Sequence, residues 1–573
     1  AGGRWRDGSN VRFWRGQPQV IGGWERIVGE RLGGVCRRVL AWADNAGELN
    51  LAFGTHATLE IWRGGGLFDV TPLRARPGVN LGVDPLGVTL DEREVVVAWP
   101  GHGLADGALI DLSGAEAVGG LSLNGEGLAV RVLDEDRVAF DAPTPASATA
   151  QGGGEAVRVS PAEPFTAGAV DGAGGAGFGT GAFSTGAFSA PSTDAFYPRT
   201  WSLAAFGEPG RASPRGGPLH GWAIARAARA APLHEAPRQV SVMLVAPSDQ
   251  VFALGCNEEV SGRFNPMCIR HSGVRAPEVW RTGPDTTARE YILAGGGRIV
   301  GARVMGQSLL VWTTDRLFIG SFVGALNQPW RFDPVGEGCG LVGPNAAAVA
   351  GGQAVWLAPD LQFRRYAPGG PVEVLACPVR GALAAHLAPG QADKISACVV
   401  SAFDEVRFDY PDARDGVENS RYLALSLRDG AWSRGVMARS AFTDAGPQEN
   451  PVGVDPEGSL FWHERGASAD GARFSWFIET ADQHLDVERT LMVRGLWPDL
   501  ADQVGPAAVT LISRLTPQGD ETVWGPHAIA PGQDRLDLRA AGRLFRLRLS
   551  GHAAPTAGRI GQPVVDVAAA GRR

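Results

Sequence analysis

Residues that could carry out catalysis or hold a cofactor are sparse in this sequence and poorly placed for it. The single lysine, Lys394, stands in ADKISA, so no GxxxxGK[ST] phosphate-binding loop can form. The GxGxxG match at Gly172, Gly174 and Gly177 lies in a Gly/Ala-rich run, with no strand pattern before it and no helix pattern after it. We interpret it as a product of composition. No GxSxG nucleophile elbow and no HExxH zinc motif occurs.

Carboxylates are concentrated in DEVRFDYPDARDGVE (404–418), and paired acids are the catalytic groups of glycosidases. The nearby SLRDGAW (426–432) partly matches the Asp-box turn of sialidase propellers, S-x-D-x-G-x-x-W. Its Asp is one place late and its Trp one place early relative to the Gly, the match does not recur, and no arginine triad can be assigned. We therefore expect a turn stabilised by Asp429 and Gly430 under Trp432, and no catalytic residues.

Metal sites are not indicated either. The ten histidines are scattered, and His102 in PGHGLADG is expected to cap a turn. The cysteines have wide, irregular spacings without a CxxC motif or a metal-like Cys/His pair, which favours reduced structural thiols at Cys36, Cys256, Cys268, Cys339, Cys377 and Cys398. We expect neither a metal nor another cofactor, and a protein that is not an enzyme.

The composition predicts a large, turn-rich β protein. A chain of 573 residues is too long to fold around one hydrophobic core and should hold about two to four domains. The 80 glycines and 39 prolines indicate many turns. The net charge of −8 argues against a chain that grips nucleic acid by neutralising phosphates, but it suits a surface along which DNA slides. No run of ~18 apolar residues occurs, and without a signal peptide we expect synthesis and folding in a cytoplasm.

Short alternating runs cut by Gly, Asp, Asn or Pro replace long helical periodicity almost throughout. LNLAFGTHATLEIWRGGGLFDVTPL (49–73) is typical, with a strand, a tight turn, a strand that carries an aromatic residue, and another turn. Similar phrases begin near residues 298, 345, 395 and 451, and a spacing of roughly 40–50 residues suits the blades of a β-propeller. We predict about five to seven blades, with stacked β-sandwiches as the alternative. HGWAIARAARAAPLHE (220–235) is a short helix candidate that ends at Pro232.

The predicted fold class is mainly β: a β-propeller-like core with an inserted small β-barrel domain and a C-terminal β-sandwich-like domain. The expected boundaries are an N-terminal segment with the first propeller strands (1–85), the inserted small β domain (86–162), a Gly/Ala/Phe-rich linker (163–197), the propeller core (198–480) and the C-terminal β domain (481–573). In the linker, Phe178, Phe183 and Phe188 recur every five residues, so it is either a flexible connection or an extended segment anchored by its rings.

Two further stretches are candidates for contacts. WRDGSNVRFWRGQPQVIGGWERI (5–27) reads as short strands and Gly corners with surplus aromatics and arginines, and it either closes the propeller or binds a neighbouring subunit. RLFRLRLSG (543–551) alternates strictly, with Arg546 and Arg548 on one face of a half-buried strand. Eight arginines stand against three aspartates from residue 534 onward, so this face is either solvated or in contact with an acidic neighbour or DNA phosphate.

Several long motifs resemble, in order, those of tail proteins from tailed bacteriophages. The opening stretch resembles their phrase D-G-x-N-V-R-F…G…P…G-G-W, and residues 51–73 resemble their next segment. GHGLADGALIDLSGAEAVGGL (101–121) resembles their HG…G…V…G…VGG module. Further counterparts are GFGTGAFSTGAF (177–188), PRTWSLAAFGEPGRASPRGGPLHGW (198–222), GLVGPNAAAVAGGQAVWLAPDLQFRRYAPGG (340–370), DGAWSRGVMARSAF (429–442) and AAGRR (569–573).

The family is that of nozzle or tail-hub proteins of short-tailed phages (tail tubular protein B-like, also called packaged-DNA stabilisation proteins), and the resemblance covers most of the chain. It implies a virion structural protein whose six copies form a ring at the end of the tail. The ring would continue the DNA channel, retain packaged DNA until ejection and dock fibres or spikes. The implied partners are the other copies in the homohexamer, the adaptor/portal complex, tail fibres or spikes, double-stranded DNA passing without sequence-specific binding, and the host envelope. The implied location is the virion tail, after assembly in the host cytoplasm.

Candidate contacts with other subunits or partners are the aromatic and arginine residues of the distinctive stretches: Trp5, Arg12, Phe13, Trp24, Phe178, Phe183, Phe188, Arg546 and Arg548. Each aromatic is equally consistent with an ordinary core. The alternative functions are a receptor- or glycan-binding propeller on the virion exterior and a propeller glycosidase or sialidase. The sequence names no residue of the DNA-channel lining, but repulsion between like charges leads us to expect a net acidic one.

Overall fold

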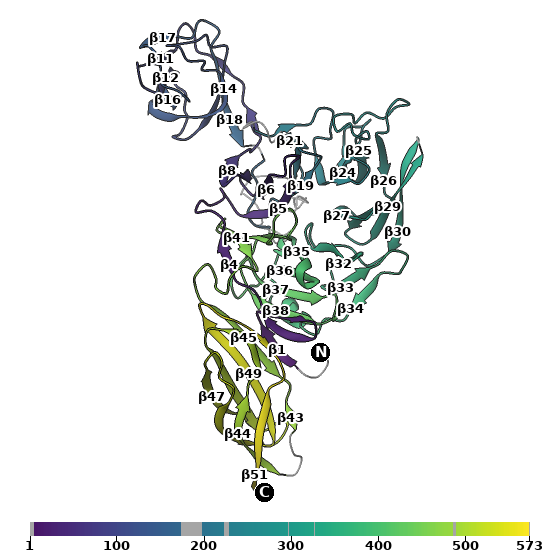
Figure 1. Ribbon diagram of the computed structural model, residues 1–573. Coiled ribbons are helices and arrows are strands. Elements are labelled where there is room, and N and C mark those ends of the chain that lie inside the picture. The colour runs from purple at the N-terminus through teal and green to yellow at the C-terminus, as the bar shows by residue number, and fades with distance from the viewer. Residues whose placement is uncertain are drawn as a thin grey trace, which may run out of the picture. The chain divides into compact units, whose positions relative to one another are not determined.

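The computed structural model describes residues 5–164, 166–172, 197–222, 229–295, 297–325, 327–484 and 489–571. Among these residues eight sheets have four antiparallel strands, and seven of the eight belong to one arrangement. The inner strands of these seven sheets are β5 (Cys36–Ala43), β19 (Trp201–Ala205), β23 (Val240–Ala246), β27 (Ile299–Met305), β31 (Ala347–Ala350), β35 (Ser396–Val400) and β39 (Ala441–Thr443). Each inner strand contacts the next, and β39 contacts β5, so the sheets close into a ring. Figure 1 shows β5, β19, β27 and β35 around one centre. The fold is a seven-bladed β-propeller, at the upper end of the predicted blade number.

The blades are numbered here from the one that contains β5. Blades one to three continue with β6 (Leu49–Thr55), β7 (Leu59–Arg63) and β8 (Gly66–Asp69); β20 (Gly210–Pro214), β21 (His220–Trp222) and β22 (Ala231–Pro232); and β24 (Gln250–Asn257), β25 (Phe264–His271) and β26 (Arg289–Ile292). Blades four to six continue with β28 (Ser308–Thr313), β29 (Leu317–Ala325) and β30 (Gln328–Gly336); β32 (Gln353–Leu357), β33 (Phe363–Tyr366) and β34 (Glu373–Leu375); and β36 (Glu405–Pro411), β37 (Asn419–Ser426) and β38 (Trp432–Val436). The helical turns are α1 (Arg380–His386), η1 (Ala392–Lys394) and η2 (Ser401–Phe403). In the described part of the chain, no helix has the length and apolar character needed to cross a membrane.

The ring is closed by strands from two distant parts of the chain. Blade seven consists of β39, β40 (Val452–Val454), β41 (Leu460–His463) and, at its outer edge, β4 (Trp24–Arg26). β4 runs antiparallel to β41, with Trp24 opposite His463, and Figure 1 shows the purple β4 beside the green β41. The rings of these two residues stack with their centroids 5.7 Å apart. The opening stretch therefore closes the propeller, which is one of the two roles that its sequence allowed.

Aromatic side chains fill the spaces between blades. Trp312 of β28 and Trp356 of β32 are fully buried, with ring centroids 5.5 Å apart. Phe363 of β33 and Phe408 of β36 are also fully buried, and their centroids are 4.9 Å apart. Burial of each such ring stabilises the fold by about 3 kcal/mol. The aromatic residue that recurs on the second strand of the repeated phrase is thus a core residue that joins adjacent blades.

A second β structure follows the propeller and uses both ends of the chain. Its largest sheet has the order β1 (Trp5–Ser9), β42 (Phe474–Thr480), β49 (Leu544–Ala553), β46 (Ala507–Arg514) and β47 (Thr522–Ile529), with β43 (Gln483–His484) also paired to β49. The other two sheets are β2 (Val11–Trp14), β3 (Gln17–Val20), β50 (Ala557–Ile560) and β45 (Leu500–Val504), and β48 (Leu536–Gly542), β44 (Thr490–Trp497) and β51 (Val564–Gly571). Val11, Trp476 and Leu549 share their core. β1 pairs with β42 and lies at one edge of the largest sheet. The C-terminal domain is β-sandwich-like, as predicted, but three of its strands come from the N-terminal stretch.

A buried ion pair fixes the N-terminal strands to the propeller. Arg12 on β2 is 4% exposed and donates to both carboxylate oxygens of Glu464, at 3.0 and 2.5 Å. Its Nε lies 3.2 Å from Glu405 Oε2 on β36. Burial would lower the pKa of Arg12, but the two carboxylates outweigh burial and raise that pKa above its ordinary value. β2, blade six and the loop after blade seven are therefore joined at one guanidinium.

Residues 70–167 form a separate unit, inserted in the sequence between blades one and two. One of its two five-stranded sheets has β10 (Val79–Asn80), β18 (Arg158–Pro164), β13 (Leu109–Ser113) and β14 (Gly125–Ala129), with β9 (Leu73–Ala75) paired to β18. The other has β15 (Arg131–Asp134), β16 (Arg137–Asp141), β12 (Glu94–Ala98), β11 (Leu86–Val88) and β17 (Ala150–Gly152). Both sheets surround one apolar core. His102 caps a turn as predicted, because its Nδ1 accepts the Leu104 N–H at 3.0 Å.

The helix expected over residues 220–235 is wrong in the described parts of that range. His220–Trp222 is strand β21 and Ala231–Pro232 is strand β22. Trp222 pairs with Gly210 of β20, where a Cβ would lie 1.9 Å from the indole. This close packing in the sheet keeps residues 220–222 in a strand.

Two other expectations need adjustment. The structure places the propeller strands in residues 24–26, 36–69 and 201–463. The strands before residue 70 lie in the segment 1–85, where the first propeller strands were expected, but the last blade ends at residue 463 and not at 480. The expected turn at 426–432 is present, but Ser426 Oγ accepts the Asp429 N–H at 3.1 Å, whereas the Asp429 carboxylate accepts the Gly16 N–H at 3.3 Å. The aspartate therefore holds the N-terminal hairpin rather than its own turn.

Replacement of Arg12 tests the attachment of the N-terminal strands. Arg12→Ala leaves the Glu464 and Glu405 carboxylates without their shared cation, and we expect a loss of about 3 kcal/mol in the free energy of unfolding, measured by urea denaturation. The control, Arg31→Ala, removes an exposed arginine and should change stability by less than about 0.5 kcal/mol. Equal stability of Arg12→Ala and the unchanged protein would show that this ion pair does not hold the strands.

Candidate functional site

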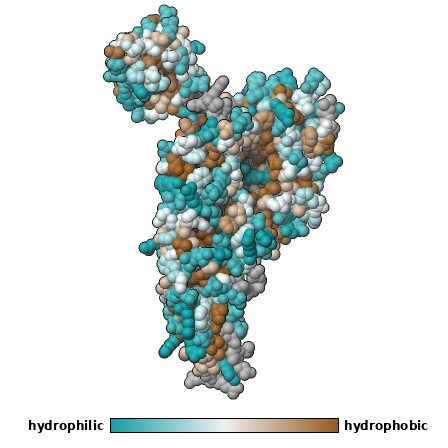
Figure 2. Space-filling view, viewed as in Figure 1, coloured by the Kyte–Doolittle hydropathy of each residue, from teal (hydrophilic) through white to brown (hydrophobic). Residues whose placement is uncertain are grey.

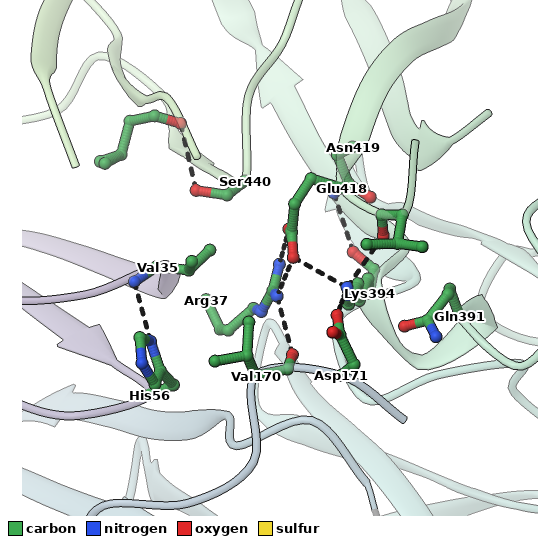
Figure 3. Close-up of polar contacts among 12 residues, drawn as sticks. Val35, Arg37, His56, Val170, Asp171, Gln391, Lys394, Glu418, Asn419 and Ser440 are labelled. Atoms are coloured by element: carbon green, nitrogen blue, oxygen red, sulfur yellow. Dashed lines mark hydrogen bonds and ion pairs between the residues drawn. The ribbon is translucent and has the colours of Figure 1, made fainter. Parts of the chain in front are cut away.

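Charged side chains converge at the end of the propeller axis where the inner strands begin. The parallel bridge between Asn345 and Ser396 shows that neighbouring inner strands start side by side and run in the same direction. Residues at the starts of several blades are thereby brought together around the axis. Figure 3 shows the hydrogen bonds and ion pairs that connect them.

Lys394, the only lysine of the sequence, is fully buried among these groups (Figure 3). Its Nζ donates to Asp171 Oδ1 at 2.6 Å, to Glu418 Oε1 at 2.8 Å and to the Val417 carbonyl oxygen at 2.8 Å. Arg37 of β5 donates to both oxygens of Glu418, at 2.5 and 2.7 Å. An ammonium group has three N–H donors, and all three are used here. Lys394 is therefore a structural clamp between segments.

The surrounding cations keep Glu418 ionised. Burial would raise the pKa of this carboxyl, but hydrogen bonds and charges from Arg37 and Lys394 outweigh burial and hold the pKa below its ordinary value of 4.5. The pKa of His56 is lowered by burial and then by the charge of Arg37. Its neutral ring accepts the Val35 N–H at Nδ1, at 2.9 Å. Both groups are thus fixed in single protonation states at neutral pH.

The segment 168–172 is held against this end of the axis by several blades. Its contacts are Gly168 N–H to the His56 carbonyl oxygen at 2.8 Å, Arg199 N–H to the Ala169 carbonyl oxygen at 2.7 Å, Arg37 Nη2 to the Val170 carbonyl oxygen at 3.1 Å, and Gly172 N–H to Gln391 Oε1 at 3.3 Å. Main-chain hydrogen bonds on successive residues determine the path of this segment. The Lys394–Asp171 ion pair then adds a side-chain anchor.

Asn345 obstructs the axis. It precedes β31 of blade five and is 8% exposed. Its Nδ2 donates to the Arg37 carbonyl oxygen at 3.0 Å and to Thr200 Oγ1 at 3.2 Å, so one side chain connects blade five with blades one and two. Arg38 Nη1 lies 3.4 Å from Asn345 Oδ1. Because the amide bridges blades across the axis, it leaves no open passage for a polymer.

Further cations lie beside these groups. Arg215 Nη1 is 3.4 Å from Asp393 Oδ2, and its guanidinium lies 3.9 Å from the centroid of the Tyr197 ring. Arg298 lies 4.5 Å from the same centroid, and Arg199 donates to the Arg215 carbonyl oxygen at 2.5 Å. We call the charged residues at this end of the axis the axial cluster, with the cations Arg37, Arg38, Arg199, Arg215, Arg298, Arg303 and Lys394 and the carboxylates Asp171, Asp393 and Glu418.

The axial cluster is suited to electrostatic binding. Guanidinium groups stay protonated and donate in fixed planar geometry, which favours oxyanions over acid–base catalysis. Among the residues with described positions, no group of three His, Cys, Asp or Glu side chains is arranged to hold a metal. The sequence motifs did not reveal this cluster, because its members come from separate segments. The one sequence feature that pointed to the cluster is that Lys394 is the single lysine of the sequence.

The candidate contact residues of the opening stretch lie against the chain itself. Trp5, Phe13 and Trp24 are partly buried against the core of the C-terminal domain. Trp5 also lines an apolar cavity of about 240 Å³, beside Phe545 of β49. Arg12 forms the buried ion pair described above. The three aromatic residues thus pack against the core of the C-terminal domain, whereas Arg12 joins the N-terminal strands to the propeller.

The remaining candidates differ in their surroundings. Arg546 is 5% exposed, with ion pairs to Glu479 at 2.9 Å and Glu521 at 3.0 Å. Arg548 keeps 41% of its side chain exposed, 3.9 Å from the centroid of the Phe477 ring. Arg548 Nη1 also lies 3.7 Å from Glu479 Oε2, so both arginines pair with carboxylates of the chain, but only the side chain of Arg548 stays substantially exposed. The phenylalanines Phe178, Phe183 and Phe188 lie outside the described residues.

Comparisons with known proteins identify no family. No protein-family model matches the sequence, and no curated protein matches it significantly. The computationally designed protein Ika8 is 11% identical over 77% of this chain and 99% of its own, with a TM-score of 0.34. BamB of Moraxella catarrhalis is 12% identical over 46% and 81%, with a TM-score of 0.27. Hsv2p of Kluyveromyces lactis is 9% identical over 47% and 75%, with a TM-score of 0.30.

The lowered pKa of Glu418 gives the axial cluster a testable pH dependence. Glu418→Gln removes the carboxylate that Arg37 and Lys394 share, and we expect it to lower the free energy of unfolding at pH 7 by about 3 kcal/mol. A depressed carboxyl pKa contributes stability that is present above 4.5 and is lost as pH falls through the folded-state pKa. Urea unfolding curves of the two proteins should therefore differ at pH 7 and converge toward pH 3. Glu30→Gln changes an exposed carboxyl and serves as the control, and its unfolding curves should match those of the unchanged protein at both pH values.

A constant difference between Glu418→Gln and the unchanged protein from pH 7 to pH 3 would contradict the assignment. It would mean that the loss of stability comes from altered packing and that the ionised state of Glu418 contributes nothing.

Proposed function

We propose that the protein is a virion structural protein, a subunit of the ring-shaped nozzle or hub at the end of a phage tail. In this role it continues the DNA channel, retains packaged DNA until ejection and docks fibres or spikes. The observation that carries the proposal is the ordered resemblance of long segments to tail proteins of this type. Its expected partners are the other copies of a homohexamer, the adaptor/portal complex, fibres or spikes, double-stranded DNA and the host envelope. Its expected location is the virion tail.

The places that the resembling segments take in the fold support the proposal. The opening stretch supplies β1 to β4, which serve the propeller and the C-terminal domain. Residues 51–73 build most of blade one, residues 198–222 lie in blade two, and residues 340–370 lie in blade five. Residues 101–121 belong to the inserted unit. Motifs that build a scaffold are what a structural subunit needs, whereas the motifs of an enzyme gather at a reactive centre.

The obstructed axis bears on the path of DNA. Asn345 bridges blades one, two and five, so a polymer does not pass through the propeller of one subunit. In a nozzle made of this chain, the DNA channel is therefore enclosed between subunits around the axis of the ring. The axial cluster inside each propeller is then distinct from the channel lining.

The oligomeric state separates the proposed function from its alternative, a receptor- or glycan-binding propeller on the virion exterior. We expect native mass spectrometry of the purified chain to give six copies, and negative-stain images to show a ring with a central hole. A monomer or a trimer would count against the nozzle. Because Arg548 keeps exposed charge, Arg548→Glu should weaken the hexamer, while Arg31→Glu, a matched change at another exposed arginine, should leave it intact.

The charge of the channel lining provides a second test. Like charge holds a DNA duplex away from the wall, so we expect the residues that face the channel to carry net negative charge, in keeping with the net charge of −8. A reconstruction of the assembled ring identifies these residues. A lining dominated by arginine would contradict the proposed sliding of DNA through the ring.

A further inference from the structure

Two arginines of the axial cluster have no carboxylate partner among the residues that the structure describes. Arg38 lies on β5 of blade one, and its guanidinium bonds to Asn345 Oδ1 at 3.4 Å. Arg303 lies on β27 of blade four and donates to the carbonyl oxygens of Ala347 at 3.0 Å and Pro344 at 3.4 Å. Both side chains therefore end at the short stretch that precedes and begins β31. Their contacts are with neutral groups.

The charges of these arginines are unfavourable to each other. Burial lowers the pKa of Arg303, and the charge of Arg38 lowers it further, to about 9. Burial also lowers the pKa of Arg38. The pKa of Arg199 is lowered by burial and then by the charge of Arg215. For Arg303 and Arg199, the charge of a neighbouring arginine thus adds to the effect of burial.

Among the described residues, cations outnumber carboxylates in the axial cluster. Its described members are seven cationic side chains and three carboxylates, in a protein whose net charge is −8. Arg38 and Arg303 remain partly exposed although they belong to inner strands. Among the described residues, no carboxylate pairs with their guanidinium groups.

We propose that the axial cluster binds a small oxyanion of the phosphate class, held by Arg38 and Arg303. A guanidinium presents paired N–H donors that match two oxygens of a phosphate, and such charge-assisted hydrogen bonds are strong where water is partly excluded. Because Asn345 obstructs the axis, the ligand is small: a free phosphate or the phosphate of a mononucleotide. This binding is independent of the proposed ring and is expected of a single subunit.

Isothermal titration of the full chain with inorganic phosphate tests the proposal, with ionic strength held constant by chloride. We expect saturable binding and a rise in melting temperature with phosphate. Arg38→Gln and Arg303→Gln each remove charged donors and should weaken binding by at least about tenfold. Arg31→Gln removes an exposed arginine elsewhere and should bind phosphate as the unchanged protein does.

A parallel titration with deoxyadenosine monophosphate distinguishes the two sources of phosphate. Binding of both ligands assigns the site to a terminal phosphate group in general, and binding of inorganic phosphate alone assigns it to the free ion. Absence of binding by the unchanged protein overturns the proposal, as does binding that Arg38→Gln and Arg303→Gln leave intact. Should either variant fail to fold, Arg303→Lys keeps the positive charge but loses the paired donors and is expected to bind more weakly than the unchanged protein.

Discussion

The pairing of β4 with β41 is the contact on which the rest of the molecule depends. A propeller is a closed ring, and its last blade lacks an outer strand until Trp24–Arg26 supplies it. Because β4 comes from the beginning of the chain, the three strands before it are positioned beside the last blades. There they complete two sheets of the C-terminal domain, and Arg12 fixes them through Glu464 and Glu405. Closure of the propeller therefore decides where the second domain is built.

Arginine has two different roles in this protein. Arg12 and Arg546 are buried beside carboxylates, so their charges are matched and they join segments that are distant in sequence. Arg38 and Arg303 are bound by neutral oxygens, and no carboxylate in the described part of the chain pairs with them at the propeller axis. Removal of a matched buried charge leaves its partner unpaired and destabilises the fold, whereas an unmatched charge keeps its capacity to bind an anion. The number of nearby carboxylates therefore separates structural arginines from those available for binding.

The blades could be predicted from the sequence because their signals are local. A strand, a turn and a second strand with an aromatic residue are adjacent in the chain, and Trp312 and Trp356 occupy that aromatic position. The closing role of the opening stretch remained one of two alternatives, because no local pattern specifies that Trp24 pairs with His463. The axial cluster could not be predicted, since Arg37, Asp171, Lys394 and Glu418 come from four separate segments. At residues 220–222, packing of Trp222 over Gly210 of the neighbouring strand produces a strand where a helix was expected, and this contact is not local in the sequence.

The pairing of the first strands with the last ones also constrains how the chain is made. Residues 5–26 pair with β41, β42 and β50, which leave the ribosome on the order of tens of seconds later at typical rates of synthesis. During this interval the first six blades can stack, but Trp5, Phe13 and Trp24 lack the later strands against which they pack. A chain released before residue 460 carries an open propeller edge together with unpaired strands at its start. A chain without residues 460–560 cannot cover these edges, and uncovered strand edges favour pairing with other chains.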